Sequence, residues 1–301
     1  MKKHMLFFLI CLVALSSAGC GLRGTESSSA PSITASANES PSSASVSPGS
    51  DASLGIQASD ASASSAPQGN EAVRVTIPEG YSASQIGDTL EAEGVCKKKD
   101  FLDMINTYDF TYYPLVAKIK PDTNRCYKLE GYLFPDTYDF YPDTKPQDVI
   151  GKMLRAAEAK IGGRYAYSGL STDQVITVAS IIEKEAATSQ EMRKVASVIY
   201  NRLELGMKQQ MDCTIHYIER HVKPNLTGDI NRYNAFYNTY KCEALPAGPI
   251  CNPGANALDA AVNPAQTDYL FFVFDTEGNY YYAKTYEEHR ENCKKAGITT
   301  G

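Results

Sequence analysis

The stretch V-I-T-V-A-S-I-I-E-K-E-A-A, residues 175–187, is the part of the chain around which the fold is organised. It is the most apolar segment after the N-terminus, and a helix that is apolar on most sides is a buried helix. Ser171 and Gln174 have the spacing of a capping box, which predicts where this helix begins. Glu183 and Glu185 stand at its end. Burial raises the pKa of a carboxyl group, and a general acid needs a raised pKa.

The helical period does not choose between these two glutamates. Glu185 follows Ile181 on one apolar flank of the helix, and Glu183 follows Ala179 on the other. Both acids lie outside the polar strip of the helix, so both are expected to be at least partly buried. Periodicity alone therefore leaves either glutamate as the catalytic candidate.

The composition is that of a globular protein with tails. The chain has 301 residues, of which 43% are hydrophobic and 21% charged, which fits one or two domains. Its formal net charge of −6 argues against nucleic acid, so we expect no such partner. The sequence contains neither an H-E-x-x-H motif nor a C-x-x-C pair. We therefore expect no metal site and no cofactor.

Residues 1–19 have the features of a bacterial lipoprotein signal peptide. Lys2 opens a positive start, and the apolar run Met5–Leu15 is too short to span a bilayer. The run leads into S-S-A-G-C, where small residues precede Cys20 as in a lipobox, although Ser17 stands where an aliphatic residue is preferred. We expect a lipid on Cys20 that anchors the protein at the extracytoplasmic face of the cell membrane. An ordinary signal peptide cut nearby is the alternative.

Residues 20–72 are expected to form a disordered tether. The segment is rich in Ser, Ala and Pro and contains almost no large apolar side chain. Such a composition cannot bury enough surface to fold. A tether behind a lipid anchor would let a folded domain work at some distance from the membrane.

Residues 73–128 are expected to form a small α/β module. V-R-V-T-I alternates as a strand, and Ser82 opens a helix that runs through Ala92. A second short helix follows over residues 99–106. A strand followed by two short helices resembles LysM-like glycan-binding modules. A small packing module without a binding role is the alternative.

Residues 129–301 are expected to form a mixed helical and β-hairpin domain, which makes the predicted fold class α+β. Helices are predicted over 146–161, 172–187, 188–205 and 255–262. The segment 268–275 reads as a buried strand, and Gly278 and Asn279 turn it into a second strand over 280–283. From residue 209 onward the chain is polar and rich in loops, and long ordered loops beside a buried acidic helix often carry binding residues.

Five strings carry a resemblance to a known family. They are L-E-G-Y-L-F-P-D-T-Y (129–138), A-S-I-I-E-K-E (179–185), V-A-S-V-I-Y-N-R-L (195–203), Y-N-T-Y (237–240) and G-P-I-C-N-P-G (248–254). Together they resemble the MltG or YceG-like endolytic murein transglycosylases over roughly residues 73–301. Members of that family cut peptidoglycan glycan strands between MurNAc and GlcNAc and leave 1,6-anhydro-MurNAc ends. The resemblance implies that Glu185 is the catalytic acid and base, with Glu183 as a supporting neighbour.

The resemblance also implies a set of sugar contacts on the polar loops. Candidates, with Glu183, are Gln210, Asp212, Tyr237, Asn238 and Thr239. Hydrogen bonds that stabilise the loops are the alternative role for each of them. Asp212 lies in a stretch similar to the family's Q-x-D-P-T, but Cys213 replaces the proline.

Two rival functions remain open from the sequence. One is a non-catalytic, cell-wall-binding lipoprotein that keeps the fold as a scaffold. The other is a hydrolytic muramidase that uses Glu185 with Asp212, because hydrolases normally add a second carboxylate. The resemblance implies peptidoglycan strands and peptidoglycan synthases as partners, and the lipid expected on Cys20 implies the membrane.

The cysteines of the exported part lead to a further expectation. An even number of them in an extracellular protein predicts at least one disulfide among Cys96, Cys126, Cys213, Cys242, Cys251 and Cys293. Cys242 and Cys251 bracket a short loop and are the favoured pair. A nucleophilic Cys–His pair is disfavoured, because no triad motif surrounds the cysteines or histidines.

Overall fold

The computed structural model describes residues 71–298. The predicted signal peptide, Cys20 and the tether up to residue 70 lie outside the described residues. Within residues 71–298, no helix is long and apolar enough to cross a membrane.

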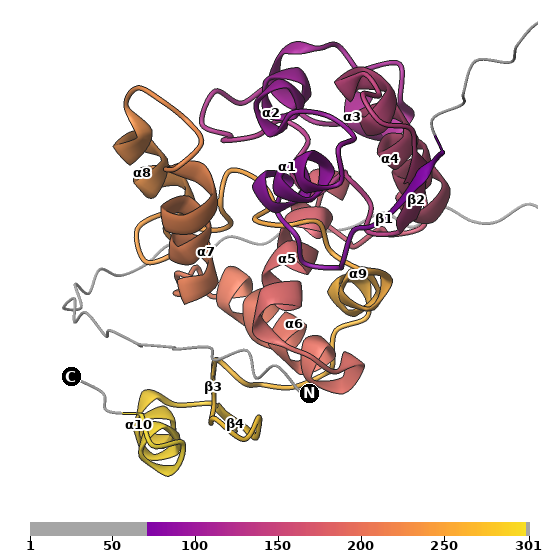
Figure 1. The fold of residues 1–301 in the computed structure, drawn as a ribbon. Helices are drawn as coiled ribbons and strands as arrows, with labels where there is room; N and C mark the ends of the chain where they lie inside the picture. The colour runs from indigo at the N-terminus through magenta and orange to yellow at the C-terminus, as the bar shows by residue number, and fades with distance from the viewer. Residues whose placement is uncertain (1–70, 299–301) are drawn as a thin grey trace, which may run out of the picture. The chain divides into compact units, whose positions relative to one another are not determined.

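The described chain is helical with two small antiparallel sheets, which confirms the α+β class (Figure 1). The first half contains β1 (Val73–Thr76), α1 (Ala83–Ala92), α2 (Lys98–Thr107), α3 (Pro114–Ala117), β2 (Thr137–Phe140), α4 (Pro146–Ile161) and α5 (Thr172–Glu185). The second half contains α6 (Ser189–Glu204), α7 (Asp212–Tyr217), the π-helical turn η1 (Ile218–Val222), the 3₁₀ turn η2 (Ile230–Arg232), α8 (Tyr233–Tyr237), α9 (Ala255–Val262), β3 (Phe271–Phe274), β4 (Tyr280–Ala283) and α10 (Tyr286–Lys295).

The first sheet joins segments far apart in the sequence. β1 pairs antiparallel with β2, with Val73 opposite Phe140 and Thr76 opposite Thr137. The chain between the two strands forms α1, α2 and α3. We refer to residues 73–140, which this sheet bounds, as the first unit; the domain boundary at 128 stays a prediction.

The second sheet is the hairpin predicted near the C-terminus. β3 pairs antiparallel with β4, with Phe271 opposite Ala283 and Phe274 opposite Tyr280. Gly278 in the turn has a φ of +87°, a conformation that costs glycine little. α10 packs on this hairpin, where the ring of His289 stacks on that of Phe271 with centroids 5.2 Å apart.

α5 is the buried central helix that its sequence predicts. The capping box of Ser171 and Gln174 forms as expected. The helix packs against α6, α7 and α9. Two residues of its polar strip are buried as well: the Ser180 hydroxyl donates to Thr177 O and accepts the N–H of Ile250 at 3.0 Å. α5 is thereby fixed to the loop that precedes α9.

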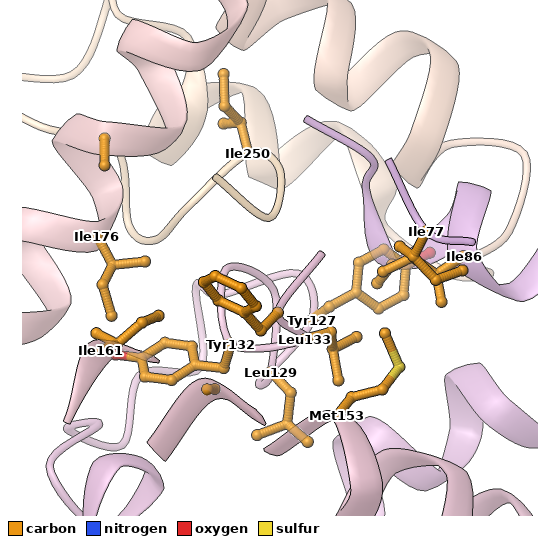
Figure 2. Close-up of a cluster of buried hydrophobic side chains, with 14 of the residues drawn as sticks. Ile77, Ile86, Tyr127, Leu129, Tyr132, Leu133, Met153, Ile161, Ile176 and Ile250 are labelled. Carbon is orange, nitrogen blue, oxygen red and sulfur yellow. The ribbon is translucent and has the colours of Figure 1, made fainter. Parts of the chain in front are cut away.

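The L-E-G-Y-L-F-P segment forms the middle of the core. Figure 2 shows Leu133 from this segment between Ile77 and Ile86 of the first unit and Ile176 of α5. Gly131 has a φ of +88°, and a Cβ at this position would lie 2.5 Å from Pro249 Cγ. The close approach explains the glycine and joins the L-E-G-Y and G-P-I-C-N-P-G strings in space.

Glu130 is a fully buried carboxylate in this segment. It accepts the N–H of Ala83 at 2.9 Å, the hydroxyl of Tyr217 at 3.1 Å and the amide of Asn252 at 3.0 Å. Burial raises the pKa of Glu130 to about 7, although these donors oppose the shift. Glu130 therefore holds together the start of α1, the end of α7 and the loop before α9.

The predicted disulfide is wrong. Each of the six cysteines among residues 71–298 is a free thiol. Cys251 is buried, and its Sγ donates to Ser180 O of α5 at 3.3 Å. Cys242 is half-buried and follows α8, where its N–H donates to Asn238 O. A short loop between two cysteines does not bring them together when one of them packs into the core.

Candidate active site

Glu185 is the last residue of α5 and is buried, with 7% of its surface exposed. The chain turns from helical to extended at Ala186, which has φ −141° and ψ 142°. Burial raises the pKa of the Glu185 carboxyl group, and the neighbouring Asp212 carboxylate raises it further. Cys213 opposes both effects through its thiol and its backbone N–H. The net effect is a raised pKa, which favours the protonated form of the Glu185 carboxyl group.

Glu183 faces another part of the molecule. Its Oε2 accepts the N–H of Gly254 at 3.1 Å, where α9 begins. Burial raises the pKa of Glu183, and the nearby Glu79 carboxylate contributes to the increase. The next residue, Lys184, donates its Nζ to Gly80 O at 3.2 Å. Glu183 therefore connects the end of α5 to α9 beside the first unit of the chain.

Asp212 opens α7, which packs against α5. The Tyr240 hydroxyl donates to Asp212 Oδ1 at 2.7 Å. The other carboxylate oxygen, Oδ2, is buried and has no hydrogen-bond partner among the described residues. The side chain is thus held by Tyr240 near Glu185, with one oxygen left to interact with another group.

Gln210 shapes the loop that leads into α7. Its φ of +54° is a left-handed conformation that is uncommon outside glycine. The Gln210 N–H donates to Thr239 O at 3.1 Å, and its Oε1 accepts from Arg202 at 3.2 Å. Backbone strain of this kind persists only where the surroundings enforce it. The side chain itself is exposed, so it can meet a ligand from solvent.

The YceG-like family pattern matches residues 52–295. The chain belongs to the YceG-like family.

Two curated relatives of this YceG-like chain carry the name endolytic murein transglycosylase. The one from Bacillus subtilis strain 168 is 34% identical over 236 residues, which cover 74% of this chain and 65% of the relative. The one from Streptococcus pneumoniae strain D39 is 33% identical over 247 residues, which cover 75% of this chain and 45% of the relative. The chain thus spans 65% and 45% of the lengths of these two relatives.

A solved structure supports the fold. The crystal structure of a putative YceG-like protein from Listeria monocytogenes superposes on this chain with a TM-score of 0.63 at 34% sequence identity. The match covers 72% of this chain and 75% of the other.

Two of the sugar contacts expected for the YceG-like chain are buried. Tyr237 and Thr239 are both 0% exposed. Thr239 Oγ1 accepts the N–H of Met211 at 2.8 Å, and Tyr237 Oη accepts the N–H of Cys126 at 3.2 Å. These hydrogen bonds to backbone groups are consistent with the loop-stabilising role that the sequence left open as the alternative. Neither side chain is exposed to solvent, and a sugar contact at either position stays a prediction.

Asn238 lies between these two buried residues and is half-buried itself. Its Oδ1 accepts the N–H of Tyr240 at 2.9 Å, which closes a turn of the type that asparagine favours. This turn orients Tyr240 toward Asp212. The structure therefore brings Glu185, Asp212 and Cys213 together, with Asn238 acting on them through Tyr240.

Three residues with clear roles were missed from the sequence. Arg202 is 5% exposed, and its guanidinium donates to the carbonyls of Lys208 and Gln209 at 2.9 and 3.0 Å, which fixes the loop before α7. Glu130 is the second, and Tyr280, whose hydroxyl donates to Glu185 O at 2.6 Å, is the third. Arg202 and Glu130 lie in two of the quoted strings as charged residues among apolar ones. This pattern could have identified both as buried charged residues. Tyr280 stands in a run of tyrosines, where nothing singles it out.

The close pair of Cys293 and His289 on α10 gives no support for a cysteine nucleophile. Cys293 Sγ lies 3.6 Å from His289 Nε2, but both residues are buried on α10. Burial raises the pKa of the Cys293 thiol and lowers the pKa of His289, and both shifts favour the neutral form. Across residues 71–298, no cluster of three or more His, Cys, Asp or Glu side chains is arranged to hold a metal ion.

Proposed function

We propose that this chain is an endolytic murein transglycosylase that cleaves MurNAc–GlcNAc bonds within peptidoglycan strands and leaves 1,6-anhydro-MurNAc ends. The names of the curated relatives support the activity and the substrate class. The observation that carries the catalytic assignment is the position of Glu185, buried at the end of α5 with Asp212 beside it. In this account Glu185 is the single general acid and base.

The chemistry needs one group that gives a proton and then takes one back. Glu185 donates its proton to the bridging O4 as the bond between that oxygen and C1 of MurNAc breaks. The resulting carboxylate removes the proton from the C6 hydroxyl of the same MurNAc, and O6 bonds to C1. No water is consumed, and Glu185 ends protonated as it began. The raised pKa of Glu185 suits the first step, and the Cys213 N–H and thiol stabilise the carboxylate of the second.

Asp212 supports a second candidate, a hydrolytic muramidase. A hydrolase uses a second carboxylate as nucleophile or as base for water, and Asp212 has one buried oxygen without a hydrogen-bond partner among the described residues. The other oxygen is engaged by Tyr240. We favour Asp212 as a neighbour that raises the pKa of Glu185. Under this assignment Asp212→Asn lowers the pKa of Glu185 and reduces the rate without changing the product.

Binding and cleavage are separable by experiment. Purified peptidoglycan is incubated with wild type and with Glu185→Gln, and both sedimented protein and released soluble fragments are measured. The proposal predicts that both proteins sediment with the wall, and that only wild type releases fragments. Release by Glu185→Gln at the wild-type rate contradicts the catalytic assignment. Binding by wild type without release would favour the non-catalytic lipoprotein.

The proposal extends to the rest of the chain. A lipid on Cys20 would hold the protein at the extracytoplasmic face of the membrane, with residues 20–72 as the tether. The order β1, α1, α2, α3, β2 with its antiparallel strand pair supports a LysM-like role in binding glycan for this unit. The catalytic residues follow in the later part of the chain. Peptidoglycan synthases are the protein partners that such a location favours.

A further inference from the structure

Tyr280 of β4 makes a direct hydrogen bond to the backbone of Glu185. Its hydroxyl donates to Glu185 O at 2.6 Å. Glu185 ends α5, and the last carbonyls of a helix have no partner within the helix. Tyr280 supplies that partner from a strand 95 residues further along the chain.

The hairpin that carries Tyr280 is itself fixed to the body of the molecule. Asn201 of α6 donates its amide to the carbonyls of Thr267 and Tyr269 at 2.8 and 2.9 Å, just before β3. Ser197 and Thr267 hydroxyls lie 2.8 Å apart. Tyr280 is half-buried against the core. Its hydroxyl is therefore held in place by contacts that do not involve Glu185.

We infer that Tyr280 is a positioning residue for Glu185, and this inference rests on the proposed function. The hydrogen bond fixes the peptide plane that follows Glu185, at the point where the chain changes from helix to extended strand. The orientation of that peptide affects the direction in which the Cα–Cβ bond of Glu185 points. A shift of about 1 Å in a catalytic group can lower a rate by about a hundredfold.

Tyr282 is a matched control on the same strand. It lies two residues further along β4, on the same face as Tyr280. Its hydroxyl donates to Glu191 Oε2 at 2.6 Å, the same distance as in the Tyr280 bond. Glu191 belongs to the first turn of α6. A phenylalanine at either position removes one hydroxyl and one hydrogen bond of equal length, and keeps the ring.

The test compares Tyr280→Phe with Tyr282→Phe on purified glycan strands. We expect Tyr280→Phe to lower kcat roughly tenfold to a hundredfold while KM stays within about twofold. Tyr282→Phe should keep kcat near that of wild type. Both variants should lose a similar, small amount of thermal stability, roughly 2–4 °C in Tm. Rates are measured well below the lower Tm, so that both proteins are fully folded.

A second readout separates positioning from simple stabilisation. A displaced Glu185 changes its distance from Asp212, so the limb of the pH–rate profile that reports Glu185 should shift in Tyr280→Phe and not in Tyr282→Phe. Equal kcat values for the two variants, or unchanged profiles in both, overturn the inference. Glu185→Gln is assayed alongside. If it retains activity the proposed function fails, whereas loss in Glu185→Gln with no loss in Tyr280→Phe defeats only the positioning role.

Discussion

Glu183 and Glu185 lie two residues apart on α5 and serve different parts of the molecule. Glu183 accepts the N–H of Gly254 at the start of α9, whereas the Glu185 carboxyl group lies beside Asp212 and Cys213 of α7. The two side chains also differ in burial, since Glu185 is buried and Glu183 is half-buried. Glu183 thus joins two helices, and Glu185 is the acid to which we assign proton transfer in the proposed function.

The role of Glu183 leads to a graded prediction. Glu183→Gln should keep most activity and stability, because the amide oxygen can still accept the N–H of Gly254. Glu183→Ala removes the acceptor at the start of α9 and should cost about 1 kcal/mol of unfolding free energy, as loss of a helix cap does. Thermal melts and fragment release measure the two effects. A folded Glu183→Gln that releases no fragments would mean that catalysis belongs to Glu183.

Glu130 predicts how stability changes with pH. Its pKa is raised from 4.5 to about 7 in the folded protein. Between these values the unfolded state has lost the proton that the folded state keeps, so stability falls as pH rises from about 4.5 to 7. The contribution of this single group over that window is on the order of 3 kcal/mol. Above the folded pKa its contribution no longer changes.

Glu130→Gln isolates that contribution. Glutamine does not titrate, so the fall in Tm from pH 4.5 to 7 should be smaller in the variant than in wild type. It offers one acceptor oxygen to the donors from Ala83, Tyr217 and Asn252, so the variant should also be less stable by about 1–3 kcal/mol. Parallel Tm-versus-pH curves for the two proteins would refute the assignment.

The free thiols predict insensitivity to reducing agents. With Cys251 packed on Ser180 and Cys242 on another loop, no covalent link contributes to stability among residues 71–298. Dithiothreitol should therefore leave Tm unchanged, and alkylation of the unfolded protein should label the same number of cysteines with and without prior reduction. A native disulfide would be worth several kcal/mol, so a clear drop in Tm on reduction would speak against this structure.

Cys20 carries the prediction on location. Cys20→Ala should move the protein out of the membrane fraction, because a lipid on this residue is the proposed anchor. Cells expressing wild type and the variant are fractionated and probed for the protein, with Cys96→Ala as the control that keeps a cysteine at position 20. Unchanged membrane association of Cys20→Ala would show that the anchor is another feature of the chain.

Local patterns in the sequence predicted local structure well. The capping boxes of α1 and α5 and the hairpin of β3 and β4 all form, because each depends on residues close together in the chain. Thr188 and Glu191 also have the spacing of a capping box, which predicts the start of α6, but only half of this box forms. Thr188 accepts the N–H of Glu191, but the Glu191 carboxylate bonds to Tyr282 of the hairpin instead of completing the box.

Contacts between distant segments could not be predicted in this way. The pairing of Val73 with Phe140 and the bond from Tyr280 to Glu185 depend on how the packed helices place the chain. The burial of Tyr237 has the same origin, since a tyrosine in a polar loop reads as a surface residue until its partner Cys126 is known. Periodicity likewise left Glu183 and Glu185 equal. The family resemblance pointed to Glu185, and the packing of α7 and α9 shows that the two acids have different surroundings.

The central claim is that Glu185 alone moves the protons of a lyase reaction. The most direct test digests purified glycan strands in ¹⁸O-labelled water with wild type and with Glu185→Gln, and identifies the new ends by mass spectrometry. The account predicts 1,6-anhydro-MurNAc ends without ¹⁸O from wild type, and a rate lower by about a hundredfold to ten-thousandfold from Glu185→Gln. Reducing MurNAc ends that carry ¹⁸O, or anhydro ends from Glu185→Gln at the wild-type rate, would contradict it.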